Sequence, residues 1–264
     1  VVLMGEQDSD KRPWGGACSK LGAVAALFYA AGGGEQYKEL AYRNLNWATY
    51  FVDEDGGPAA LWLEDEFKKG SWQEDCHTDV VHNFVDALTA VPEWADGPRG
   101  RQARPERIGF HTARYNDAGK LIPYLPLGEV VKREVDWYRT CGVLVNGYPS
   151  WVCSSFVDDA FRPFKTDIVA GCQCGMGILS YLKYWEYTGK GDAYLLDMAR
   201  AQGDYLVKEC NTTGEGVYPL FTRSTGNNTD FPLKKSSQGD SNYGENVIEP
   251  DKGGLAGYAL LKLY

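Results

Sequence analysis

The sequence predicts a mainly α-helical protein built from helical hairpins, with a β-rich insertion in its middle. Apolar residues recur at helical spacing near both ends of the chain. Between them, short alternating runs are separated by Pro, Gly and Asn-Asp turn signals. A helix–Gly–helix pattern also occurs twice. We therefore divide the chain into helical hairpins at 1–96, a β-rich insertion or small β subdomain at 97–165, and helical hairpins at 166–264.

Two helices are expected in the first part of the chain. After a polar entry that ends at Pro13, apolar residues favour a helix over about 17–31, and the triple Gly at 32–34 ends it. A second helix is predicted over about 36–52, before an acidic Gly-Gly-Pro loop. Its expected inner side carries Tyr37, Leu40, Ala41, Leu45, Ala48 and Phe51.

Residues 70–94 carry the strongest site signal. Their second half predicts a helix over 78–90, with Thr78 or Asp75 as the N-cap and Pro92 beyond the end. The apolar residues at helical spacing are Val80, Val81, Phe84, Val85 and Leu88.

Polar groups crowd the start of this helix. Asp79 should lie in its first turn, with His82 and Asn83 three and four residues on and on the same side. Trp72 and His77 are close by in the sequence. A carboxylate, an imidazole, an amide and an aromatic ring suit the wall of a pocket. The alternative is a helix start whose acids cap it and offset its dipole.

The sequence predicts strands in the insertion at 97–165 and helices in the part at 166–264. Within 97–165, an alternating run at 107–115, an Asn-Asp-Ala-Gly turn and a second run at 120–125 indicate a β-hairpin. Further on, helices are predicted over about 167–187 and 192–209, with a break at Gly189, and a last helix near Asp251. The long polar connection at 211–250 is of a length that is usually functional or disordered.

A loose internal repeat links the two helical parts. In both copies an apolar helix ends at Gly and a Tyr opens a second helix. The matching positions are Phe28, Tyr37, Ala41 and Tyr50 in one copy and Trp185, Tyr194, Ala199 and Tyr205 in the other. Residues 254–264 are similar to the first half of a third copy. Repeated hairpins imply a stacked or closed array whose loops form a common cleft. The alternative is an irregular helical domain.

Charge and composition exclude some partners. The net charge of −9 argues against nucleic acid or an anionic membrane as the main partner. An anionic substrate remains compatible if a local Arg supplies the countercharge. Aromatic residues make up 13% of the chain, and their rings suit either sugar faces or a large core.

No cofactor or metal is expected. HExxH is absent, and His77 and His82 are five residues apart, so they do not converge on one helix. Gly253-Gly254 lacks the context of a phosphate loop. The seven cysteines form no CxxC, which favours free thiols and slightly favours the cytoplasm. We expect a fragment of a longer protein, because the chain starts at Val1 and stops inside an apolar run at Tyr264.

The hairpins resemble the six-hairpin (α/α) toroids of glycoside hydrolases and polysaccharide lyases. Three segments, in family order, are similar to unsaturated glucuronyl and rhamnogalacturonyl hydrolases. Asp79-Val-Val-His-Asn resembles the family's Asp-x-x-Met-Asn, whose Asp is the general acid/base. The segment from Asp167 to Gly177 is similar to Asp-Ser-x-Trp-x-Arg-Gly-Gln-Ala-Trp, with Gln173 in the Gln place. The run that starts at Asp251 is similar to the late Asp-x-Ser-Ala-x-x-Ala helix.

The sequence also departs from the family. The early His-Asp-x-Gly-Phe is absent, although Asp8 or Asp10 lies at a suitable distance upstream. The family's substrate-binding Arg is replaced by Gly171 or Cys172, and its Trp is replaced by Gly175.

The resemblance implies hydration of a 4,5-unsaturated uronic sugar at the end of an oligosaccharide, with Asp79 as catalytic acid/base and Asp10 as a second acid. The residues expected to bind substrate are Trp14, Trp72, His77, His82, Asn83, Asp167, Gln173, Arg223 and Asp251. Two alternatives stay open. One is a polysaccharide lyase that uses His82, Tyr243 and Arg223, and the other is a non-catalytic carbohydrate-binding or assembly protein.

Overall fold

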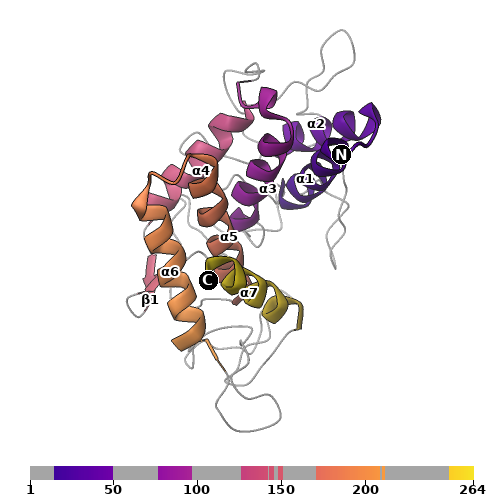
Figure 1. The fold of residues 1–264 in the computed structure, drawn as a ribbon. Coiled ribbons are helices and arrows are strands. Elements are labelled where there is room, and N and C mark those ends of the chain that lie inside the picture. Colours follow the sequence, from indigo (N-terminus) through magenta and orange to yellow (C-terminus); the bar gives the residue numbers. More distant parts are fainter. Residues whose placement is uncertain are drawn as a thin grey trace, which may run out of the picture. The chain divides into compact units, whose positions relative to one another are not determined.

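The part of the protein that the structure describes is mainly α-helical (Figure 1). The computed structural model describes residues 15–49, 77–96, 126–141, 143–145, 148–150, 171–208, 210–211 and 250–264. These residues form seven α-helices, a short 3-10 helix and two three-residue strands. The chain divides into two units, Val1–Cys141 and Gly142–Tyr264, and each is described by itself. Among the described helices, none combines the length and hydropathy that a membrane span needs.

The first unit opens with the expected helical hairpin, α1 (Gly15–Ala30) and α2 (Glu35–Ala48). Small residues of α1 allow close packing: a Cβ on Gly22 would lie 2.6 Å from the Leu45 Cγ of α2. Ala41, Leu45 and Ala48 are buried as predicted. Leu40 was wrongly placed on the inner side, since it is 37% exposed, and Asn44 is buried in its place.

The same C-terminal signal ends the first helix of both copies of the internal repeat. At the end of α1, the Gly33 amide donates to the Phe28 carbonyl and Gly32 has φ +101°. At the end of α5 (Gly171–Tyr187), the Lys190 amide donates to the Trp185 carbonyl and Gly189 has φ +84°. Both are Schellman motifs, which need a left-handed residue that Gly supplies without strain. The sequence repeat is therefore also a structural repeat at this turn.

Helix α3 (His77–Ala90) follows in the first unit and ends in the 3-10 turn η2 (Pro92–Trp94). Its start is within one residue of the predicted one. The residues predicted to face the core are all buried: Val80, Val81, Phe84, Val85 and Leu88. Trp94 of η2 is buried as well, with its ring 5.5 Å from that of Tyr42 on α2.

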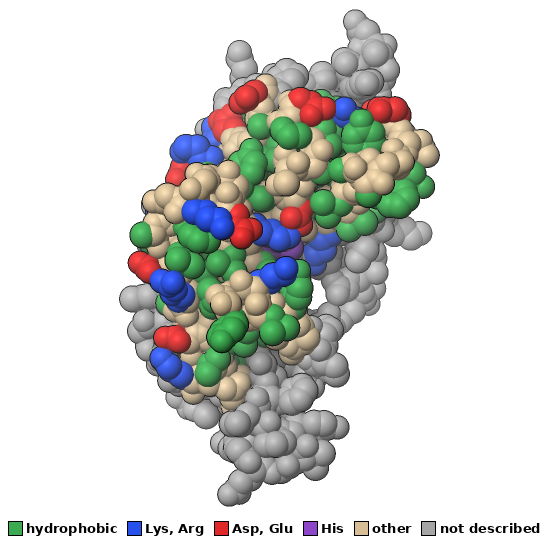
Figure 2. Space-filling view, viewed as in Figure 1, with side chains coloured by type: hydrophobic (Ala, Val, Ile, Leu, Met, Phe, Trp, Pro, Cys, Tyr) green, Lys and Arg blue, Asp and Glu red, His purple; other side chains and the backbone are tan. Residues whose placement is uncertain are grey.

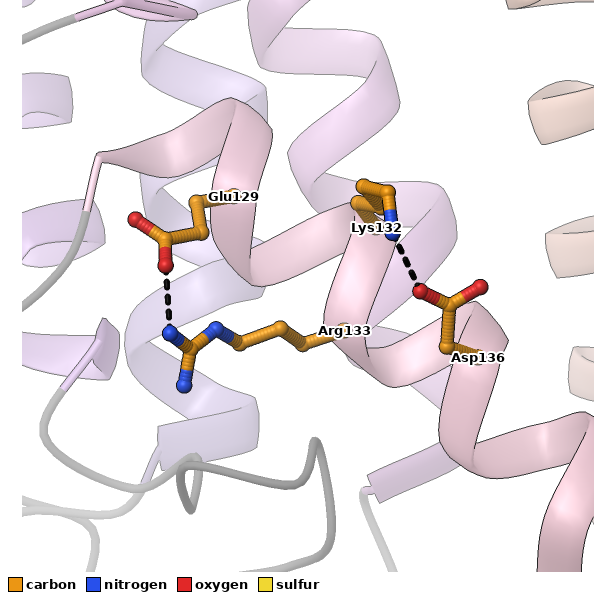
Figure 3. Close-up of polar contacts among 4 residues, drawn as sticks. All are labelled: Glu129, Lys132, Arg133 and Asp136. Carbon is orange, nitrogen blue, oxygen red and sulfur yellow. Dashed lines mark hydrogen bonds and ion pairs between the residues drawn. The ribbon is translucent and has the colours of Figure 1, made fainter.

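Residues 127–141 form helix α4 (Leu127–Cys141), where the sequence was read as part of a β-rich insertion. Its buried residues recur at helical spacing: Leu127, Val130, Val131, Glu134, Val135, Trp137 and Tyr138. This helical period was missed because it contains the adjacent pair Val130–Val131 and an acid, Glu134, at an internal position. Two ion pairs run along its outer side, Glu129 with Arg133 and Lys132 with Asp136 (Figure 3). The predicted hairpin at 107–125 lies outside the described residues.

In its described residues, the second unit contains a small hairpin and three helices. Strands β1 (Val143–Val145) and β2 (Tyr148–Ser150) pair antiparallel, with Val143 opposite Ser150, and β2 lies against α6 (Ala193–Lys208). Helix α5 packs on both α6 and α7 (Pro250–Leu263). Helix α7 lies across the α5–α6 hairpin, because Ala256 meets Gly175 of α5 while Leu263 meets Gly203 of α6 (Figure 1).

Charged side chains of both signs are interspersed on the visible surface, with apolar side chains between them (Figure 2). Several pairs are four residues apart on one helix, such as Arg43 with Glu39 and Lys208 with Asp204. Such exposed pairs add a few tenths of a kcal/mol each, about 0.3–0.5 kcal/mol. Helix α1 departs from this pattern, because Val24, Leu27 and Phe28 are all about half exposed or more.

Candidate functional site

The structure describes the side chains of two of the predicted site residues, His82 and Asn83, both on α3. Four others have a described helical backbone only: His77 and Asp79 in α3, Gln173 in α5 and Asp251 in α7. The remaining predicted residues lie outside the described part of the chain: Asp10, Trp14, Trp72, Asp167 and Arg223.

Three of the predicted segments share one structural position, the first turn of a helix. Asp79 is the third residue of α3, Gln173 the third of α5 and Asp251 the second of α7. The amides of a first turn have no partner inside the helix and carry partial positive charge. A ligand near these turns therefore meets backbone donors as well as side chains.

Helices α1 and α3 run parallel, so their first turns lie at the same end of the first unit. Near that end, the Asn83 Nδ2 donates a hydrogen bond to the Ser19 Oγ at 3.1 Å. Near the other end, the Lys38 Nζ lies 2.8 Å from the Glu93 carboxylate and 5.2 Å from the centre of the Tyr29 ring. Ten residues separate Ser19 from Tyr29, and ten separate Asn83 from Glu93. Glu93 follows α3 in η2, so the two contacts come in the same order along α1 as along α3 and η2, which requires a parallel arrangement.

Buried polar side chains gather toward this shared end. Ser19 and Thr49 are fully buried, and Asn83 is 6% exposed. Because α1 and α2 are antiparallel and Gly22 meets Leu45, Ser19 lies toward the level of the last turn of α2, which ends beside Thr49. Asn44 and Asn46 of α2 are also fully buried. Ser19, Thr49 and Asn83 thus place two hydroxyls and an amide in the interior toward this end of the unit.

The hydrogen bonds of these groups are only partly satisfied. Asn44 donates to the Leu40 carbonyl at 2.8 Å, and the Thr49 hydroxyl donates to the Asn46 carbonyl at 2.7 Å. Neither side-chain atom of Asn46 has a hydrogen-bond partner among the described residues. A buried amide without a partner costs about 1–3 kcal/mol, so the side chain of Asn46 lowers the stability of the fold.

The opposite end of this unit is aromatic. Phe28 and Tyr37 meet edge to face with ring centres 4.5 Å apart, and Tyr42 meets Trp94. The Lys38–Glu93 bond lies here, and it raises the pKa of Lys38 and lowers the pKa of Glu93. These shifts come from an exposed ion pair remote from the Asp79 turn, so they belong to the stability of the fold.

Asn83 was predicted to bind substrate, and the structure gives its amide nitrogen a protein partner, Ser19. A ligand at Asn83 would have to share or replace that bond. His82, its neighbour, is half buried. The sequence reading missed Ser19, Asn44, Asn46 and Thr49. For Asn44 and Asn46, the available signal was their place among the buried apolar residues of α2.

Glu134 of α4 is a second group that the sequence reading missed. Its side chain is fully buried, although a carboxylate in a low-dielectric interior is costly. It occupies the helical position that its apolar neighbours Val131 and Tyr138 predict to be internal. A buried acid between apolar neighbours at helical spacing is the signal that could have found it.

Gly175 of α5 stands where the hydrolases that the sequence resembles would have a substrate-binding Trp. A Cβ on Gly175 would lie 3.1 Å from the backbone nitrogen and Cα of Ala256. This side of α5 is therefore used for close helix packing. A large side chain at this position is incompatible with the observed place of α7.

Among the described residues, no three His, Cys, Asp or Glu side chains come together in a way that suits a metal ion. Comparison with known proteins adds no assignment: no protein-family model, no curated protein and no solved structure matches the chain.

Proposed function

We propose that the chain is a carbohydrate-active enzyme on an (α/α) toroid, and that it acts on uronate-containing oligosaccharides by acid/base chemistry at Asp79. One observation carries the proposal. The turn that holds Asp79 lies at the same end of the first unit as the start of α1, toward which buried amides and hydroxyls gather. Amides and hydroxyls are the groups that pair with sugar hydroxyls, because each can donate and accept hydrogen bonds.

The start of α1 supports a substrate with a carboxylate. The first turns of α1 and α5 carry no acidic side chain. The first turns of α2 and α4 each carry a Glu. An uncompensated helix N-terminus attracts anions through its free amides and its dipole. A uronate carboxylate is the part of the substrate that would use this field.

The hairpin architecture supports the toroid. Both hairpins of the repeat end their first helix in the same Schellman turn at Gly32 and Gly189. The first helix of each hairpin also packs against the next helix after that hairpin: α1 packs on α3, and α5 packs on α7. Helix α1 also leaves Val24, Leu27 and Phe28 exposed, and a closed ring would bury such a face against a neighbouring hairpin.

In the proposed reaction, the protonated Asp79 carboxyl donates its proton to a carbon of the vinyl ether double bond of the unsaturated sugar. The resulting carboxylate then accepts a proton from the water that attacks the adjacent carbon, so the acid is regenerated. Asp79 must be protonated when substrate binds. The N-terminus of α3 opposes this, since it favours the carboxylate, and burial or a neighbouring acid has to outweigh it.

Asp79→Asn tests the proposal, with Asp86→Asn as the matched control two turns further along α3. The ultraviolet absorbance of a 4,5-unsaturated oligouronide falls when its double bond is hydrated. We expect the wild type and Asp86→Asn to cause this loss and Asp79→Asn to abolish it with the far-ultraviolet circular dichroism unchanged. Full activity in Asp79→Asn would remove this residue from the mechanism.

The same assay separates the two alternatives. A polysaccharide lyase creates the conjugated double bond, so absorbance would rise with an intact polyuronide as substrate. A non-catalytic carbohydrate-binding protein would bind the oligouronide without any change in absorbance. The packing of Gly175 against α7 favours this second alternative, because it excludes a Trp at the position where the hydrolases that the sequence resembles have one.

A further inference from the structure

The hydrogen bond between Ser19 and Asn83 is a directional tie between two parallel helices. Ser19 is fully buried and Asn83 is 6% exposed, with 3.1 Å between the Oγ and Nδ2 atoms. The neighbouring contacts of α3, Val80, Val81 and Phe84, are apolar and change little when a helix turns or slides slightly. A buried hydrogen bond is less tolerant, because a lost partner leaves a desolvated polar group. This bond therefore selects the rotation and register of α3 against α1.

Asp79 lies one turn before Asn83 on the same side of α3, about 6 Å along the helix axis. First turns of helices fray readily, so the nearest tertiary contacts decide where their residues lie. Ser19 gives α3 a described polar contact at Asn83, one turn from Asp79. The contact between Lys38 and Glu93 lies beyond the other end of α3, in η2.

We propose that Ser19 is a positioning residue: through Asn83 it holds the α3 turn that carries Asp79. The consequence for turnover rests on the proposed function, whereas the consequence for the α3 turn does not. Ser19 contacts Asn83 and has no role of its own in the proton transfer.

Ser19→Thr and Ser19→Val give a matched test, since the two side chains have the same shape and only Thr keeps the hydroxyl. Lys38→Met is the control that removes the tie at the other end. Hydrogen exchange of the α3 amides at 80–84 reports the position of the turn without any substrate. We expect exchange there at least about tenfold faster in Ser19→Val than in Ser19→Thr, and unchanged in Lys38→Met.

Turnover of a 4,5-unsaturated oligouronide gives the second readout. We expect kcat of Ser19→Val about tenfold or more below that of Ser19→Thr, with KM within about threefold, because a small displacement of a reacting group lowers kcat steeply. The pH profile of kcat should shift in Ser19→Val and stay in place in Lys38→Met, since only the former changes the surroundings of Asp79. A lower fraction of folded protein would reduce the apparent kcat but would leave its pH profile unchanged.

Equal exchange in Ser19→Thr and Ser19→Val would overturn the inference, as would faster exchange with an unchanged kcat and pH profile. A wild-type chain without turnover of this substrate would overturn the proposed function instead. The exchange comparison would then still decide whether Ser19 holds the first turns of α3.

Discussion

Gly175 of α5 approaches the backbone of Ala256 in α7 so closely that a Cβ on Gly175 would lie 3.1 Å from both the nitrogen and the Cα of Ala256. The atoms in the way are backbone, so they cannot move aside by a change of rotamer. Close approach through a Gly lets two helices gain contact along their backbones, at the expense of the lower helix propensity of Gly. The place of α7 across the α5–α6 hairpin therefore depends on this residue.

Gly175→Ala should be less stable than Gly254→Ala by about 2 kcal/mol. Both changes gain about 1 kcal/mol of helix propensity, but the first adds a methyl group to a filled contact at a cost of about 1–3 kcal/mol. Gly254 is exposed on α7, and a Cβ there has no neighbour within 4 Å. Urea denaturation of the two variants measures the difference. Equal stability would mean that α5 and α7 do not meet at this point.

The helices were predictable where the sequence carries both a period and a stop signal. Helix α3 was expected at 78–90 and lies at His77–Ala90, because five buried apolar residues and Pro92 define it locally. Gly32 and Gly189 ended α1 and α5 as expected, since both adopt positive φ. Helix α4 was missed because Glu134 occupies an internal position that an apolar residue usually takes. The short hairpin β1–β2 was not predicted at these residues, although Asn146-Gly147 between its strands is a turn signal.

The site was less predictable, because its polar groups meet only through tertiary packing. Asn83 was selected for its spacing from Asp79, but nothing in the local sequence pairs it with Ser19, 64 residues earlier. Asn46, between Leu45 and Trp47 in the sequence, is buried although it is polar. Such contacts depend on how α1, α2 and α3 pack. Hydrophobic periodicity predicts which face of a helix is internal, but it does not predict which buried polar side chains bond to each other.

Gln202→Met should stabilise the protein by about 1–2 kcal/mol. Gln202 of α6 is fully buried, and neither atom of its side-chain amide has a hydrogen-bond partner among the described residues. Met has a similar length and no amide to desolvate, so the substitution removes the cost of a buried unpaired polar group. Thermal unfolding of Gln202→Met and of Gln202→Ala separates this effect from packing, because Ala also leaves a cavity. A destabilised Gln202→Met would show that the amide is needed where it lies.

The Lys38–Glu93 pair gives a pH dependence whose sign follows from the two pKa shifts. The hydrogen bond from Lys38 lowers the pKa of Glu93 below its ordinary value of 4.5, so this stabilisation is present above that pH and is lost as pH falls through the lowered pKa. The same bond raises the pKa of Lys38 above 10.5, so that stabilisation is present below 10.5 and is lost as pH rises through the raised pKa. The pair should therefore contribute most between these two limits.

Lys38→Met removes the charge and keeps most of the aliphatic stem, so it isolates this contribution. We expect its melting temperature to lie slightly below that of the wild type near neutral pH, because an exposed pair contributes little. The difference should shrink toward strongly acidic and strongly alkaline pH, and also in high salt, which screens exposed charges. Arg43→Met serves as the control, since its pairing with Glu39 stays within α2 while Lys38 reaches from α2 to the end of α3. A difference that stays constant across pH would assign the loss to the packing of Lys38 on the Tyr29 ring.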